Sequence, residues 1–338
     1  MASQKKLSPA DAKALTKSTV LNGTKYSYIL SEPTNGRPKA TIVLCHGWPD
    51  CSFGWRYQIP FLTALGLRVV APDMMGYGGT DAPKVPPHDI HLYTFKQAAD
   101  DVAALAHHLG ASKIILGGHD WGGMVVYRIA QWYPQLVTHI FSVCTPYASP
   151  SDTFYSTETL VNGPVPKFGY QLQLAGPDVE SAIQTEDDIE QFLHGIYAGK
   201  APPGKFFLSP EKGADLSLIG KIGKSRLLDD NEMKYIVEKY SRTGMHGPLN
   251  WYRTREANFN DEKNLPNRKM DHPVLFILAS QDTVLTRDLS NGMEKLVPNM
   301  IRREVTAGHW ALWQASDEVN QHVKQWLETT VFGGKSTL

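Results

Sequence analysis

The stretch KIILGGHDWGGMVVYRIAQWYP, residues 113–134, has the pattern of a strand, a glycine-flanked turn and a helix. Its opening apolar run is short and rich in β-branched residues, as in a buried strand. Gly118 and Gly122 flank Asp120, and glycine permits the tight, strained turn that exposes a central side chain. The stretch therefore predicts a sheet strand that ends in an exposed Asp120 carboxylate and is followed by a helix.

Short apolar runs of the same kind recur along the chain. They are nearly continuous in apolar residues and end in glycine or polar residues, which indicates strands buried on both faces, as in a parallel sheet. Amphipathic helices are predicted at residues 94–110 and near residues 319–327. The pattern predicts an α/β fold, a mostly parallel central sheet flanked by helices. The expected strands are residues 40–47, 68–76, 113–120, 139–146, 273–282 and 301–309.

Between residues 147 and 265 the alternation of strands and helices stops. Apolar residues there recur at helical spacing, as in residues 189–197 and 233–240. We expect a helical cap at 147–265, inserted into a core formed by residues 1–146 and 266–338. Such a cap would cover the carboxyl ends of the strands, where open α/β sheets bind their ligands.

The balance of charges narrows the classes of partner. The 338 residues include 34 Lys and Arg against 34 Asp and Glu, so no net charge favours nucleic acid or an anionic membrane. The chain has no apolar run of about 18 residues and no N-terminal stretch of signal-peptide type. We therefore expect a cytoplasmic protein, without stable membrane insertion, and we interpret the three cysteines as buried reduced thiols.

The pentapeptide GHDWG, residues 118–122, fits the nucleophile-elbow pattern G-x-S-x-G with Asp120 in the serine position. In this architecture the acid and the histidine follow the nucleophile in the sequence. Asp282 and His309 follow in that order, each directly after a predicted strand. Taken alone, Asp282 could be a turn cap and His309 a surface loop residue. Their joint placement favours a triad of Asp120, Asp282 and His309.

The segment CHGWPD, residues 45–50, ends the first strong strand, at the place where an oxyanion hole is expected. Pro49 has no N–H, so we predict that the backbone N–H groups of Trp48 and Trp121 form the oxyanion hole. A simple turn is the alternative interpretation of this segment.

An aspartate nucleophile indicates a particular chemistry. With an ordinary pKa of about 3.9, it is already ionised at neutral pH and needs no base before it attacks. Attack on an sp3 carbon that bears a leaving group would give an alkyl ester on Asp120. A water molecule activated by His309, with Asp282 orienting the histidine, would then hydrolyse that ester.

The leaving group separates two kinds of substrate. A halide leaves as a stable anion, whereas an epoxide oxygen leaves as a basic alkoxide and needs a strong hydrogen-bond donor. Tyrosine suits that task because it stays neutral at pH 7. The predicted cap contains Tyr170 in KFGYQLQLAGPDVE and Tyr252 in GPLNWYRT.

Several of these motifs together resemble epoxide hydrolases of the α/β-hydrolase fold, especially the soluble type. They are HGWPD, GWRYQIPFL, PDMMGYGGTDAP, GGHDWGG, FGYQLQLAGPDVE, GPLNWYR and AGHW, and they span residues 40–310. The resemblance implies that Asp120 is the nucleophile and that Asp282 and His309 activate water. It further implies that Tyr170 and Tyr252 donate hydrogen bonds to the epoxide oxygen. It also implies the hydrolase domain alone, without the phosphatase-type domain of longer relatives.

Other functions remain as alternatives. A haloalkane dehalogenase would use the same nucleophile, with the indoles of Trp48 and Trp121 as a halide cradle. Asp120 itself disfavours a serine-type esterase, and a non-catalytic receptor on this scaffold would be expected to lack at least one catalytic residue. We expect a small apolar epoxide as substrate, no metal or other cofactor, and a monomer or homodimer.

Overall fold

The computed structural model describes residues 6–34, 36–265 and 268–333 of the chain. These residues form two compact units. The first holds the described residues within Met1–Met74, Phe95–Pro150 and Leu265–Leu338, and the second holds Met75–Thr94 and Ser151–Asn264. The boundaries of a core and a cap given above stay a prediction, and residues 75–94 join the second unit by their contacts.

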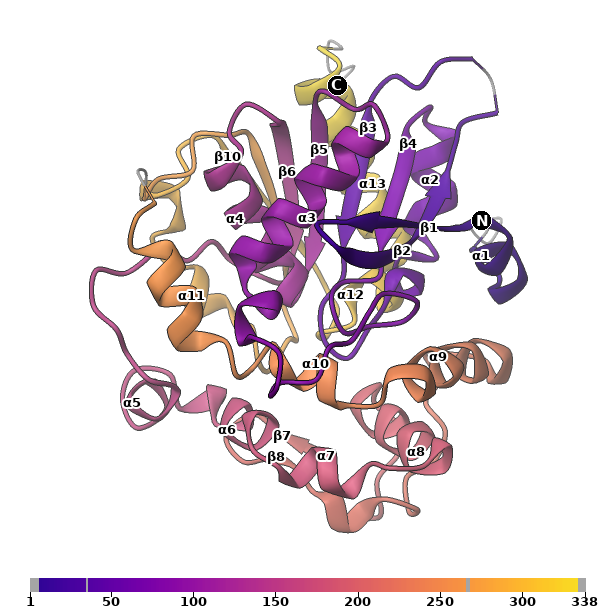
Figure 1. The fold of residues 1–338 in the computed structure, drawn as a ribbon, viewed down its shortest axis with the longest axis vertical. Coiled ribbons are helices and arrows are strands. Elements are labelled where there is room, and N and C mark those ends of the chain that lie inside the picture. Colours follow the sequence, from indigo (N-terminus) through magenta and orange to yellow (C-terminus); the bar gives the residue numbers. More distant parts are fainter. Residues whose placement is uncertain (1–5, 35, 266–267, 334–338) are drawn as a thin grey trace. The chain divides into compact units, whose positions relative to one another are not determined.

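The first unit contains an eight-stranded sheet in the described part of the chain (Figure 1). The strand order is β1-β2-β4-β3-β5-β6-β9-β10. β1 and β2 are antiparallel to their neighbours, and all pairs from β4 to β10 are parallel. The predicted mostly parallel sheet is therefore confirmed. The strands are β1 (Thr16–Leu21), β2 (Thr24–Ser31), β3 (Thr41–Cys45), β4 (Arg68–Pro72), β5 (Ile114–His119), β6 (Val137–Val143), β9 (Val274–Ala279) and β10 (Met300–Val305).

Helices cover both faces of this sheet. α3 and α4 pack together on one face, in front of the sheet in Figure 1, while α2 and α13 pack together on the other face. The long helix α3 buries Ala98, Val102 and Leu105 on one side, as its amphipathic sequence predicts. The helices of this unit are α1 (Pro9–Leu15), α2 (Gln58–Ala64), α3 (Phe95–His108), α4 (Trp121–Trp132), α12 (Ala311–Gln314) and α13 (Ser316–Trp326).

The antiparallel strands β1 and β2 were not among the expected strands. β1 pairs only with β2 and lies at the edge of the sheet, and most of its residues are partly or fully exposed. An edge strand that is not buried on both faces does not need a continuous apolar run. The pattern of apolar runs therefore predicts the central strands and not β1. β2 is mostly buried, but Ser27 and Ser31 interrupt its apolar residues, so it has no continuous run either.

The second unit is mainly helical. α8 buries Ile189, Phe192 and Leu193 against α9, which buries Met233 and Ile236, as the helical spacing predicts. A two-stranded ribbon, β7 (Leu208–Ser209) and β8 (Gly213–Ala214), packs against α6. The helices are α5 (Thr157–Val161), α6 (Tyr170–Ala175), α7 (Asp178–Ala182), α8 (Glu186–Ile196), α9 (Asp230–Thr243), α10 (His246–Asn250) and α11 (Arg255–Glu262).

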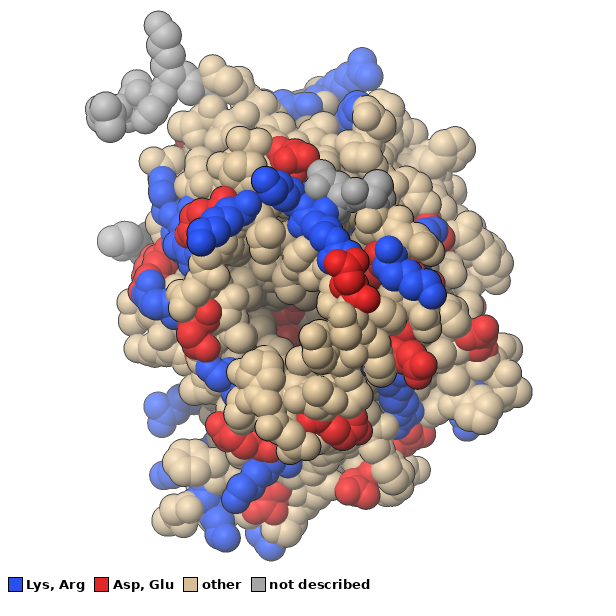
Figure 2. All heavy atoms as spheres, turned by 90° about the vertical axis from the view of Figure 1, so that its left-hand side faces the viewer, with Lys and Arg blue, Asp and Glu red and all other residues tan. Residues whose placement is uncertain are grey.

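The surface carries charges of both signs. On the face shown in Figure 2, lysine and arginine side chains alternate with aspartate and glutamate, and neither sign forms one large patch. Among the residues that the structure describes, no helix is both long enough and apolar enough to cross a membrane.

Candidate active site

Asp120 stands in the turn between β5 and α4, as the strand–turn–helix pattern predicts. Its backbone has φ 53° and ψ −126°, a conformation that residues other than glycine rarely adopt. The flanking glycines are required by space: a Cβ at Gly118 would lie 2.4 Å from the Gly122 oxygen, and a Cβ at Gly122 would lie 2.0 Å from the Cys45 oxygen. The turn is thus compressed between β3 and α4.

Three hydrogen bonds hold the strained backbone of Asp120. The hydroxyl of Thr145 and the N–H groups of Gly123 and Met124 donate to the Asp120 carbonyl oxygen, at 2.7, 2.9 and 3.4 Å. A conformation of this kind costs on the order of 1–3 kcal/mol and persists only where its surroundings fix it. Thr145 follows strand β6, so the neighbouring strand in the sheet supports the turn.

The two carboxylate oxygens of Asp120 have different surroundings. The backbone N–H of Trp48 donates to Oδ1 at 2.8 Å, and the N–H of Trp121 also donates to this carboxylate. Gly47 makes room for it, because a Cβ there would lie 2.3 Å from Oδ1. Oδ2 instead lies 3.6 Å from Nε2 of His309. The amide of Trp48 therefore holds one oxygen, and the histidine faces the other.

Asp282 and His309 form a buried hydrogen-bonded pair. Nδ1 of His309 lies 2.8 Å from Oδ2 of Asp282, and the N–H groups of Val284 and Leu285 donate to Oδ1 at 2.9 and 3.0 Å. Burial opposes ionisation of Asp282, but the charge of His309 and these hydrogen bonds outweigh it and lower its pKa to about 2. Asp282 is thus a fixed negative charge that orients the ring of His309.

His309 is held between two carboxylates. Burial opposes its charged form, but the charge of Asp282, the hydrogen bond to it and the charge of Asp120 together raise the pKa of His309 to about 9. Burial also raises the pKa of Asp120, and the charge of His309 and the amides of Trp48 and Trp121 limit that rise. His309 is therefore an imidazolium at neutral pH, beside the Asp282 carboxylate.

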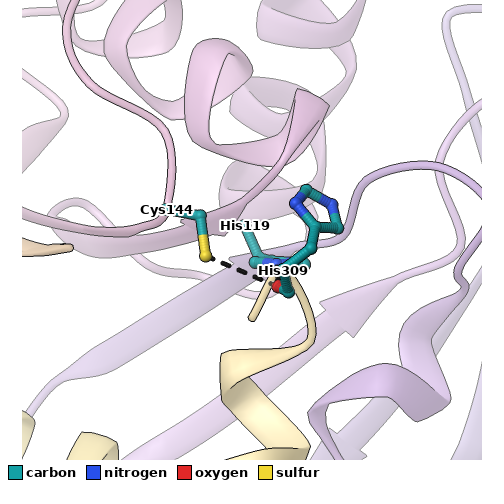
Figure 3. Close-up of side chains that lie close together, drawn as sticks. All are labelled: His119, Cys144 and His309. Atoms are coloured by element: carbon teal, nitrogen blue, oxygen red, sulfur yellow. Dashed lines mark hydrogen bonds between the residues drawn. The ribbon is translucent and has the colours of Figure 1, made fainter. Parts of the chain in front are cut away.

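Two further side chains hold the backbone of His309, as Figure 3 shows. The Nε2–H of His119 donates to the His309 carbonyl oxygen at 2.8 Å, and the Cys144 thiol lies 3.4 Å from the same oxygen. Burial and the charge of His309 lower the pKa of His119 to about 3, so the ring is neutral. We expect a buried reduced thiol at each cysteine, and neither the elbow pattern around His119 nor the apolar run around Cys144 indicates a contact with a backbone oxygen.

His119, Cys144 and His309 are also the group of possible metal ligands found among the described residues, with ligand atoms within 4.8 Å of one another. The group does not suit a resident metal ion. Burial, with the nearby charges of Asp282 and Asp120, raises the pKa of the Cys144 thiol well above its usual value. Nδ1 of His309 is already engaged by Asp282 at 2.8 Å. Two of the three side chains already contact the His309 carbonyl oxygen.

Tyr170 and Tyr252 lie together in the second unit. Both are 7% exposed, and their rings meet edge to face with centroids 6.0 Å apart. The amide of Gln171 donates to the Tyr170 hydroxyl oxygen at 3.3 Å. That contact uses the hydroxyl as an acceptor and is compatible with donation of its proton.

The structure thus brings together five predicted site residues in the first unit and the two tyrosines in the second. Sequence reasoning did not single out Gly47 or Thr145. The sequence does carry a signal for each of them: Gly47 belongs to the HGWPD motif, and Thr145 lies next to the end of the predicted strand 139–146. The five residues of the first unit are Trp48, Asp120, Trp121, Asp282 and His309.

Comparisons with known proteins identify the family of this chain. A family model described as alpha/beta hydrolase fold matches residues 40–178. An epoxide hydrolase of Neurospora crassa is 38% identical over 318 residues, which cover 90% of this chain and 92% of the relative. The bifunctional epoxide hydrolase 2 of Sus scrofa is 32% identical over 294 residues, and the chain spans about half of it, 51%.

Solved structures show the same likeness. The crystal structure of epoxide hydrolase A from Mycobacterium thermoresistibile superposes with a TM-score of 0.78 at 26% identity, covering 92% of this chain and 97% of that one. An epoxide hydrolase from Vigna radiata, 22% identical, has the same fold with a TM-score of 0.78 over 93% of this chain and 97% of its own. With an aspartate in the nucleophile elbow and near-full-length similarity to the Neurospora protein, the chain belongs to the epoxide hydrolase family of the α/β-hydrolase fold.

Proposed function

We propose that the protein hydrolyses small apolar epoxides to vicinal diols through a covalent ester on Asp120. The observation that carries this proposal is the pair of environments around the Asp120 carboxylate. The backbone amide of Trp48 holds Oδ1, while Oδ2 faces a histidine that Asp282 orients. This arrangement supports a carboxylate that is alkylated in one step and released by water in the next.

In the first step, Oδ2 of Asp120 attacks an epoxide carbon from the side opposite the carbon–oxygen bond that breaks. The electron pair of that bond moves to the epoxide oxygen, which takes a proton from Tyr170 or Tyr252. Oδ1 becomes the carbonyl oxygen of the ester. It already accepts the N–H of Trp48 at 2.8 Å, so the ester forms with its carbonyl oxygen in the oxyanion hole.

Formation of the ester changes the task of His309. Esterification removes the negative charge of Asp120, one of the causes that raise the pKa of His309 to about 9. The pKa of His309 therefore falls, and His309 releases a proton. This proton restores the hydroxyl of the tyrosine that protonated the epoxide oxygen. Neutral His309 is then a base for the second step.

In the second step, His309 takes a proton from a water molecule, whose oxygen attacks the ester carbonyl carbon. Negative charge develops on Oδ1, where the N–H groups of Trp48 and Trp121 stabilise it. The tetrahedral intermediate collapses by cleavage of the bond between the Asp120 carbonyl carbon and Oδ2. The departing alkoxide takes the proton of the newly added hydroxyl, so the diol leaves while Asp120 is again a carboxylate and His309 an imidazolium. The sum of both steps is epoxide plus water to diol.

Two observations favour an epoxide over a haloalkane. Tyr170 and Tyr252 lie edge to face in the second unit, a pair of phenols that a halide leaving group does not need. The relatives from Neurospora crassa and Sus scrofa are named as epoxide hydrolases. A dehalogenase with the same nucleophile is the second candidate.

The test is parallel incubation of the purified protein with an aryl-substituted epoxide and with a bromoalkane of similar size. We expect diol and no bromide. Bromide without diol would identify a dehalogenase and would leave the tyrosines as packing residues.

The nucleophile is tested by Asp120→Asn. We expect diol formation to stop, because the neutral amide cannot attack the epoxide, while the fold is kept because the side-chain shapes match. Steady-state diol formation measures the first, and circular dichroism measures the second. Normal turnover would contradict the assignment, provided that mass spectrometry shows no deamidation back to aspartate.

A further inference from the structure

Arg253 follows Tyr252 directly, and its guanidinium joins several parts of the second unit. The side chain is 22% exposed, so most of it lies within the protein. It reaches backbone carbonyls at the end of α6, a side chain of α10 and a carboxylate of α7. The bonds run from Nε to Ala175 O (3.0 Å), from Nη1 to Asn250 Oδ1 (2.9 Å), and from Nη2 to Gly176 O (3.2 Å) and Glu180 Oε2 (2.9 Å).

The helix that Arg253 caps is the one that carries Tyr170. α6 runs from Tyr170 to Ala175 and has six residues, so the tyrosine stands at the first residue of this short rigid helix and the capped carbonyls at its other end. Gln173, within α6, fixes the other side of this helix by two hydrogen bonds to the backbone of Ala214 in β8, at 2.6 and 2.8 Å. Arg253 therefore sets where this helix lies relative to the chain segment of Tyr252.

A second layer of contacts holds the guanidinium in place. Nδ1 of His246 lies 2.8 Å from Oε1 of Glu180, and the N–H of Val85 donates to Nε2 of His246 at 2.9 Å. Because Nε2 accepts, Nδ1 carries the proton and donates to Glu180. Glu180 thus receives Arg253 on one oxygen and His246 on the other, which fixes its orientation.

We propose that Arg253 is a positioning residue that fixes the two tyrosine hydroxyls at one point, where both can reach the epoxide oxygen. This proposal rests on the proposed function, in which Tyr170 and Tyr252 are the donors. Two donors act on one oxygen only if their separation is fixed to a few tenths of an ångström. Two chain segments 82 residues apart carry these tyrosines, with ring centroids 6.0 Å apart, and Arg253 hydrogen-bonds to both segments.

The first experiment separates the two chemical steps in Arg253→Met and Arg253→Lys. Rapid quenching followed by mass spectrometry measures the rate of ester formation and the rate of ester loss. We expect ester formation to slow by about 10-fold to 100-fold in Arg253→Met, since small displacements of reacting groups have effects of this size, and less in Arg253→Lys. Ester hydrolysis, which does not use the tyrosines, should keep its rate. Equal slowing of both steps would overturn the proposal.

The matched control is Arg255→Lys. Arg255 lies two residues further along and also donates to a backbone carbonyl, that of Tyr155, but it has no contact with α6 among its hydrogen bonds in the described residues. We expect unchanged rates for both steps. A loss as large as that of Arg253→Lys would show that any arginine of this segment matters, and it would overturn the specific role of Arg253.

The second experiment combines Arg253→Lys with Tyr252→Phe. If Arg253 acts through the tyrosine pair, the arginine substitution should slow ester formation much less in the Tyr252→Phe background than alone. Fully multiplicative effects would overturn the proposal while leaving the tyrosines as donors. A different result, no effect of Tyr252→Phe or Tyr170→Phe on ester formation, would mean failure of the proposed function itself.

The surroundings of Arg253 allow a chemical rescue. The guanidinium lines a cavity of about 520 Å³, together with Glu180, Ser181, Gln184 and His246. In Arg253→Ala, added guanidinium ion at concentrations too low to denature should enter this space and raise the rate of ester formation. Acceleration of ester hydrolysis to the same extent would contradict a role confined to the tyrosines.

Discussion

The aspartate at position 120 suits the proposed chemistry, but its backbone conformation is strained. A serine in the elbow needs its histidine as a base before it attacks, whereas a carboxylate attacks without help. The histidine beside Asp120 is therefore free to rest as imidazolium, and its pKa of about 9 suits that state. The same residue adopts a strained φ of 53°, which β5, α4 and Thr145 maintain. The nucleophile needs no base, but its strained backbone has to be stabilised by the surrounding fold.

In the proposed mechanism Asp120 attacks the epoxide and His309 activates water, so a variant without the histidine should accumulate the ester on Asp120. In His309→Gln, Asp120 should still be alkylated, because attack needs no base, and the ester should persist because no group activates water. Mass spectrometry of the quenched variant should find the protein plus one substrate mass. Consumption of substrate without this adduct would contradict the two-step scheme.

The pair of Asp282 and His309 predicts how stability depends on pH. The pKa of His309 is raised from 6.5 to about 9, so its contribution is fully present below pH 6.5 and is lost as the pH rises through 9. Because one pKa unit corresponds to about 1.4 kcal/mol, we expect a loss on the order of 3 kcal/mol. Urea unfolding on both sides of this window measures it. His309→Gln should not show this loss, and an equal fall in the variant would assign it to other groups.

At the scale of elements, the site is built from the loops that follow four parallel strands. Trp48 follows β3, Asp120 follows β5, Asp282 follows β9 and His309 follows β10. β6 lies between β5 and β9 and contributes Thr145, which supports the elbow, and Cys144, which contacts the His309 carbonyl oxygen. Every strand from β3 to β10 in the sheet therefore positions a part of the site.

The turn that holds Asp120 lies so close to β3 that one added methyl group at Gly122 should strongly reduce stability. Gly122→Ala would place a Cβ 2.0 Å from the Cys45 carbonyl oxygen, and neither backbone can move without disturbing the sheet. We expect a loss of about 3 kcal/mol in unfolding free energy, the upper end for overpacking, measured by urea denaturation. The matched substitution Gly223→Ala, whose nearest atom would be 3.5 Å away, should change stability by about 1 kcal/mol or less.

The elements differ in how far sequence alone predicts them. The central strands β3, β5, β6 and β9 were predictable because each contains a continuous apolar run, and Asp120 and Asp282 come shortly after two of these strands. β10 instead carries two arginines and a glutamate, and His309 was predictable from its order behind the nucleophile and the acid. β1 was not predictable, because its side chains are mostly exposed. The contacts of His119 and Cys144 end on a backbone oxygen, and those of Arg253 end mainly on carbonyls, so no pattern of side chains could indicate them. The roles of the site residues themselves stay predictions.

At the scale of the whole molecule, the charges balance and carry no net attraction for an ion. The chain has 34 basic and 34 acidic residues, and both signs are mixed on the face in Figure 2. A neutral epoxide would experience no long-range steering. We expect kcat/KM to change by less than about twofold as ionic strength rises from roughly 0.02 to 0.3 M, although the Debye screening length falls severalfold over this range. A steep fall with salt would instead indicate an anionic substrate.

Under the proposed mechanism, the unequal surroundings of the two Asp120 oxygens give them different lifetimes. Oδ1 accepts the N–H of Trp48, while Oδ2 faces His309. If Oδ2 is the attacking atom, each diol leaves with the atom that stood at Oδ2, and solvent supplies the replacement. In water enriched in oxygen-18, the peptide containing Asp120 should gain one heavy atom during the first turnover and no second one later, and the first diol should carry a light oxygen from the protein. One oxygen of this side chain would then be renewed at every cycle, and the other would be as old as the polypeptide.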